Sequence, residues 1–185
     1  GGQFCPKIVD ENGKLLFGWK DKSGGKKYKR FLRFYLSAVR SFLKSSGYEE
    51  RVYFHLSDEP ERKYVGQYIR KSKFLYRFID KAKTIDAVSD PQLFHIPTLD
   101  VPVVATVFYD RAGRLPQNWM LYYACIGNDH MWTNRFMYMP LQRVRVLGYQ
   151  LYLTHSVGFL HLGFNFYHTQ YSVRKIDSYE VTDAG

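Results

Sequence analysis

The alternation of short apolar runs with segments of helical periodicity constrains the fold most. Five runs are rich in β-branched and aromatic residues, as buried strands typically are: 51–57, 84–88, 101–107, 119–125 and 159–165. Three segments with apolar residues at helical spacing precede or separate them, over about 26–43, 58–80 and 140–154. Strands that alternate with helices predict a parallel sheet with right-handed crossovers.

The length limits how such a sheet can close. A (β/α)8 TIM-type barrel takes about 250 residues, and this chain has 185. We therefore predict an α/β fold that is an incomplete (β/α)8 barrel, comprising roughly its C-terminal half or more, as a single domain over 1–185. The alternative is an open doubly wound sheet, which is disfavoured because no glycine-rich phosphate loop follows a strand.

The ends of the chain and its first element add two expectations. Ile8-Val9 and Leu15-Leu16-Phe17 flank Asn12-Gly13, a pattern that predicts a hairpin, and Gly47 is a plausible stop for the first helix. Because the chain opens with Gly1-Gly2 rather than Met, we expect it to be part of a longer protein. Its localisation is left open.

Composition excludes several classes of site. With two cysteines (Cys5 and Cys125) and no HExxH or CxxC pattern, the sequence predicts no metal site, and no cofactor is expected. No run is long enough to span a bilayer, so no membrane partner is predicted. The net charge of +10 would suit nucleic acid. However, the basic residues cluster on the predicted helices, where charge usually marks the solvated face, and no nucleic-acid module is recognisable.

Polar and aromatic residues gather where the predicted strands end. The strand ends read His55-Leu-Ser-Asp-Glu59, Asp86-Ala-Val-Ser-Asp90, Tyr122-Tyr-Ala-Cys125 and Gly163-Phe-Asn-Phe-Tyr167. Catalytic groups of (β/α) barrels project from the carboxyl ends of their strands. Together with an aromatic content of 18%, which suits stacking on sugar rings, these ends predict a carbohydrate site on one rim.

The pair Asp58-Glu59 has two interpretations. Acidic residues before a helix often interact with the helix dipole as caps. The pair also ends an apolar strand, and neighbouring carboxylates shift each other's protonation, so that one could serve as a general acid. Adjacent carboxylates act most naturally from one side of a sugar, which fits substrate assistance by a 2-acetamido group better than a pair across the scissile bond.

Several of these segments resemble one known family. His55-Leu-Ser-Asp-Glu-Pro60, Ile85-Asp-Ala-Val-Ser-Asp90, Tyr122-Tyr-Ala-Cys125, Asn134-Arg-Phe136 and Gly158-Phe-Leu-His-Leu-Gly-Phe-Asn165 are similar, in the same order, to the catalytic domain of glycoside hydrolase family 123. The resemblance covers nearly the whole chain.

The resemblance implies a bacterial β-N-acetylgalactosaminidase-like, retaining, substrate-assisted hydrolase of terminal 2-acetamido-glycosides. It implies that Glu59 is the general acid/base and that Asp58 stabilises the acetamido nitrogen of the oxazolinium intermediate. The expected substrate-binding residues are His55, Tyr122, Tyr123, Trp119, Trp132, Asn134 and Asn165.

Two other functions stay possible on the sequence. A non-catalytic carbohydrate-binding barrel would use the same aromatic residues without turnover. Nucleic-acid binding ranks last, and it would show affinity that falls steeply with salt. The oligomeric state is not predicted.

Overall fold

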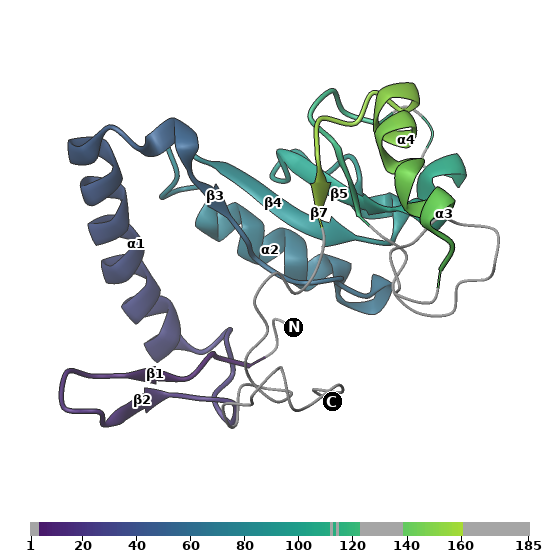
Figure 1. The fold of residues 1–185 in the computed structure, drawn as a ribbon. Helices are drawn as coiled ribbons and strands as arrows, with labels where there is room; N and C mark the ends of the chain where they lie inside the picture. Colours follow the sequence, from purple (N-terminus) through teal and green to yellow (C-terminus); the bar gives the residue numbers. More distant parts are fainter. Residues whose placement is uncertain (1–3, 112, 114, 123–138, 161–185) are drawn as a thin grey trace, which may run out of the picture.

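A five-stranded parallel sheet forms the centre of the molecule (Figure 1). The computed structural model describes residues 4–111, 113, 115–122 and 139–160. The strands lie side by side in chain order: β3 (Tyr53–Phe54), β4 (Lys83–Val88), β5 (Val101–Ala105), β6 (Met120–Tyr122) and β7 (Phe159–Leu160). Every neighbouring pair is parallel, which confirms the predicted parallel series of about five strands.

The hairpin and the first helix also form where the sequence predicts them. Strand β1 (Ile8–Val9) pairs antiparallel with β2 (Leu15–Phe17), and Gly13 takes a φ of +78° in the turn between them. Helix α1 runs from Lys26 to Ser46 and ends at Gly47. With a φ of +71°, Gly47 adopts the left-handed conformation that commonly terminates helices.

The helix predicted to start at the acid pair begins later. A single 3-10 turn, η2 (Arg62–Tyr64), leads into α2 (Val65–Leu75), and neither element has a side-chain hydrogen bond at its cap. Glu59 has a φ of +38°, which is incompatible with a helical start. The cap interpretation of the pair is therefore wrong: both acids lie in the loop before η2.

The remaining helices are short. The helix predicted over 140–154 is two helices, α3 (Leu141–Arg145) and α4 (Leu147–Leu153). Three further 3-10 helices complete the described elements: η1 (Glu49–Arg51), η3 (Pro91–Leu93) and η4 (Thr106–Arg111).

The two faces of the sheet are packed differently. Val88 and Val104 point toward the helices, in a cluster that includes Tyr68 of α2 and has Leu147 of α4 packed against it. A second cluster joins Leu36 of α1 to the end of α2. On the other face, Ala87, Val103 and Ala105 form a cluster to which no α-helix contributes among the described residues.

The described sheet is open, with β3 and β7 at its edges, so a closed barrel is not found in this part of the chain. In the same part of the chain, no helix combines the length and apolar character needed to cross a membrane.

Candidate active site

The loop between β3 and η2 carries the acid pair at the carboxyl edge of the sheet. Both Asp58 and Glu59 are exposed. The N–H of Glu59 donates to the carbonyl oxygen of Ala87 in β4, at 3.1 Å. Non-glycine residues with positive φ cost free energy and cluster at functional sites. At Glu59, the hydrogen bond from its N–H to the carbonyl oxygen of Ala87 holds this backbone conformation against β4.

A buried carboxylate lies directly behind this loop. The side chain of Asp86, in β4, is 0% exposed. Its Oδ1 accepts hydrogen bonds from the backbone N–H groups of Leu56 (2.8 Å) and Ser57 (3.1 Å). Its Oδ2 accepts from the hydroxyl of Tyr68 in α2, at 2.6 Å. Asp86 thus connects the loop and α2 to its own strand, β4. Hydrogen bonds to charged groups are among the stronger ones in proteins.

His55 completes the surroundings of Asp86. Its Nδ1 lies 2.7 Å from Oδ1 of Asp86 and 3.4 Å from the carbonyl oxygen of Ile85. Both neighbours are acceptors, so Nδ1 carries the proton. The hydrogen bond to Asp86 raises the pKa of His55, with a further contribution from the charge of Asp58, while burial opposes the shift.

Tyr68 stays a donor across the physiological range. Burial is the main cause that raises the pKa of its hydroxyl far above the usual range, and the charge of Asp86 adds to the effect. The ring is 3% exposed. The Tyr68 hydroxyl is thus a permanent partner for the buried carboxylate.

Two cavities adjoin the loop, and Glu59 borders both, whereas Asp58 is in the lining of neither. One, of about 490 Å³, opens at the carboxyl ends of β4 and β5. Its lining is Glu59, Pro60, Glu61, Arg62, Ser89, Asp90, Pro91 and Phe108. This cavity occupies the position where the sequence predicts the sugar site, and it combines acidic side chains with an aromatic ring.

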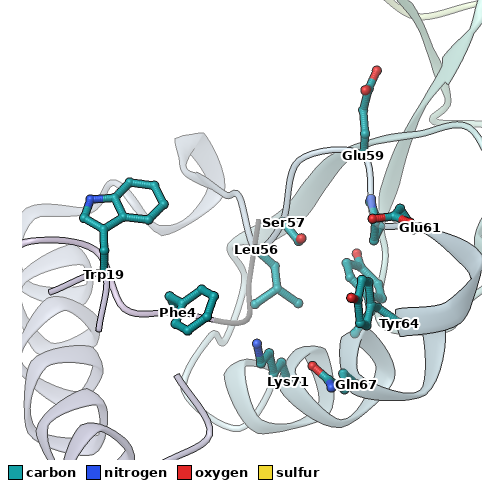
Figure 2. A pocket seen from close by; sticks show the side chains of 11 residues that line it. Phe4, Trp19, Leu56, Ser57, Glu59, Glu61, Tyr64, Gln67 and Lys71 are labelled. Carbon is teal, nitrogen blue, oxygen red and sulfur yellow. The ribbon is translucent and has the colours of Figure 1, made fainter. Parts of the chain in front are cut away.

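The other cavity, of about 300 Å³, lies between the N-terminal segment and α2. Figure 2 shows Phe4 and Trp19 on one side of it, with Tyr64, Gln67 and Lys71 on the other. The side chain of Glu59 points away from these residues. Its carboxylate is therefore directed away from this cavity, and the cavity at the ends of β4 and β5 is the better candidate site.

The remaining predicted site residues divide into two groups. Trp119 is 3% exposed and stacks on Tyr109, with ring centroids 5.4 Å apart. It packs in the cluster on the helix side of the sheet, so it lies in the core, and its predicted contact with a sugar stays a prediction. Tyr122 ends β6, and only its backbone is described. Four predicted site residues lie outside the described residues: Tyr123, Trp132, Asn134 and Asn165.

Asp86 is the site residue that the sequence analysis did not single out. The signal was present, because Asp86 interrupts the apolar run from Ile85 to Val88, and aspartate is almost never buried without partners. What the sequence could not supply was the identity of those partners. Within the described ranges, no three His, Cys, Asp or Glu side chains are grouped to hold a metal ion.

Comparisons with known proteins show similarity of sequence to one family and of fold to one of its members. The family model described as glycoside hydrolase 123, catalytic domain, matches residues 6–184. A solved family 123 glycoside hydrolase from Clostridium perfringens, studied for glycolipid glycan hydrolysis, has a similar fold with a TM-score of 0.59 and 12% sequence identity. The similarity covers 81% of this chain but 27% of that one, so this chain spans about a quarter of the relative's length. No curated protein sequence matches the chain.

Proposed function

The chain belongs to glycoside hydrolase family 123, and on that basis we propose that it takes part in retaining hydrolysis of terminal 2-acetamido sugars, of the β-N-acetylgalactosaminidase type. The observation that carries the proposal is the position of Glu59. Its side chain is exposed beside a cavity at the carboxyl ends of β4 and β5, next to a second acid in the same loop.

The proposed mechanism uses the two acids differently. The acetamido oxygen of the substrate attacks the anomeric carbon while Glu59 gives its proton to the departing oxygen, which breaks the glycosidic bond. Asp58 accepts the acetamido N–H as the nitrogen becomes positively charged. Glu59 then removes a proton from the water that opens the oxazolinium ion, which returns both acids to their starting states.

We also propose that the described sheet is an arc of a (β/α)8 barrel and that the chain forms one catalytic domain. Two features support this. The strands follow one another in chain order, whereas a doubly wound sheet reverses its order at a switch point. The helices α2 and α4 pack against the same face, and among the described residues no α-helix contributes to the cluster of Ala87, Val103 and Ala105 on the other, as expected when helices form the outer ring of a barrel.

The test compares Glu59→Gln with the wild-type protein on two β-linked N-acetylgalactosaminides, a nitrophenyl glycoside and a disaccharide. General acid–base catalysis is worth about 10²–10⁴-fold, and the poorer leaving group depends on it more. We expect Glu59→Gln to lose more activity on the disaccharide than on the nitrophenyl glycoside. The matched control is Glu50→Gln, an exposed glutamate in η1 that pairs with Lys81. Equal turnover of the disaccharide by wild type and Glu59→Gln would contradict the proposal.

The second candidate is a carbohydrate-binding barrel without catalysis, which the exposed aromatic rings of Phe4 and Trp19 favour. Calorimetric titration with N-acetylgalactosamine distinguishes the two. Binding that accompanies turnover supports the hydrolase, and binding with no product released from either substrate supports the alternative.

A further inference from the structure

The backbone ladder between β3 and β4 is replaced by a side chain just before the acid pair. Regular pairing covers Tyr53 with Lys83 and Phe54 with Thr84. Beyond it, the N–H groups of Leu56 and Ser57 turn to the carboxylate of Asp86. Backbone pairing to β4 resumes with the N–H of Glu59. The Asp86 side chain therefore holds the part of the loop that leads into Asp58.

The carboxylate itself is held from the side of the helix. Tyr68 donates to Oδ2 from α2, while His55 and the loop occupy Oδ1. A buried carboxylate is expensive to desolvate and is tolerated when such partners surround it. Its two backbone partners, the N–H groups of Leu56 and Ser57, belong to the loop that carries the acid pair. The carboxylate therefore fixes the backbone that leads into Asp58 and Glu59.

Asp86 does not reach the candidate cavity. It is 1% exposed, it is absent from the cavity lining, and its partner Tyr68 belongs to the cluster between the sheet and the helices. Asp86 therefore acts on the site through its hydrogen-bond partners on the loop side, the N–H groups of Leu56 and Ser57 and the imidazole of His55.

We propose that Asp86 is a positioning residue for Asp58 and Glu59, acting through the N–H groups of Leu56 and Ser57, with Tyr68 fixing the orientation of its carboxylate. This inference rests on the proposed function, because it assigns Asp86 to the same site. It predicts that loosening the carboxylate costs turnover rather than substrate binding, since a displacement of about 1 Å at reacting groups can cost on the order of 100-fold in rate.

Asp100, which directly precedes β5, provides a matched control at the other end of β4. Asp100 accepts hydrogen bonds from the N–H of Thr84 (2.8 Å) and from the hydroxyl of Tyr76 (2.8 Å). This arrangement repeats that of Asp86 and Tyr68, but at the amino end of β4, away from the acid pair. Asp100→Asn and Tyr76→Phe thus remove similar hydrogen bonds without touching the loop.

The experiment measures kcat and KM on the nitrophenyl N-acetylgalactosaminide for Asp86→Asn, Tyr68→Phe, Asp100→Asn and Tyr76→Phe, with the thermal midpoint of each. We expect kcat to fall about 100-fold in Asp86→Asn and about 10-fold in Tyr68→Phe, with KM nearly unchanged. The two controls should keep wild-type kcat. Amide hydrogen exchange should speed up at Leu56, Ser57 and Glu59 in Asp86→Asn only, measured below the thermal midpoint.

The outcomes separate this inference from the proposed function. If the wild type turns over the substrate and Asp86→Asn keeps its kcat, the positioning role is overturned while the proposed function stands. Equal losses of kcat in the Asp86 and Asp100 variants would also overturn it, because they would reflect general destabilisation. If the wild type itself has no activity, the proposed function fails and this inference fails with it.

Discussion

Nδ1 of His55 lies 2.7 Å from Oδ1 of Asp86, so an exposed imidazole at the edge of the loop shares a buried carboxylate with the backbone that leads to the acid pair. His55 is the solvent-facing member of this arrangement, with 55% of its side chain exposed. A change of bulk pH that alters the charge of His55 therefore alters its interaction with the carboxylate that holds the loop.

Stability should depend on pH through His55. The hydrogen bond to Asp86 raises its pKa in the folded protein above the 6.5 of an unfolded chain. A raised pKa means that the folded state binds the proton more tightly. The contribution is thus fully present below pH 6.5, and it is lost as the pH rises through the folded-state pKa.

Chemical denaturation across this range measures the effect. We expect the free energy of unfolding of the wild type to decrease from pH 6 upward, by a small amount because solvent screens the half-exposed imidazole of His55. His55→Gln should flatten this part of the profile. His95→Gln, which changes an exposed histidine between η3 and β5, should not. A profile that is unchanged in His55→Gln would contradict the assignment.

Tyr68→Phe should destabilise the fold more than Tyr76→Phe. Each change removes one hydroxyl donor from an aspartate. Tyr68 is 3% exposed and its partner is fully buried, whereas Tyr76 is 39% exposed, so water can replace only the second donor. We expect Tyr68→Phe to lower the free energy of unfolding by about 1.5–3 kcal/mol, and Tyr76→Phe by less. Urea titration of both variants checks this, and equal losses would speak against it.

Glu59→Gly should be more stable than Glu59→Ala. The φ of +38° at this position strains any residue with a Cβ atom, and glycine relieves that strain at the cost of a more flexible unfolded chain. We expect glycine to exceed alanine by about 1 kcal/mol in the free energy of unfolding. Comparing these two variants removes the effect of the lost carboxylate, and a more stable alanine variant would argue against strain in the loop.

Trp119 should behave as a core residue. Because it is 3% exposed and stacked on Tyr109, we expect Trp119→Ala to lower the free energy of unfolding by about 3–5 kcal/mol. Trp119→Phe should retain much of the packing and leave KM for the nitrophenyl glycoside unchanged. A KM that rises in Trp119→Phe, with the thermal midpoint preserved, would instead restore the sugar contact that the sequence predicts.

The amino-acid sequence by itself determined the parallel series of strands, the hairpin around Gly13 and the end of α1 at Gly47. These features depend on local periodicity and on backbone preferences of single residues, which are legible along the chain. The family was also legible, because its motifs are short and ordered.

Only the tertiary structure decided what surrounds the acid pair. Asp86 meets Leu56, 30 residues earlier in the chain, and Tyr68, 18 residues earlier. That contact network, rather than a helix dipole, holds the loop, and η2 begins only after it. Trp119 is buried for a similar reason, since the core cluster to which it belongs also contains residues of α2 and β4. Such partners are set by how strands and helices pack across the sheet, which no local pattern encodes.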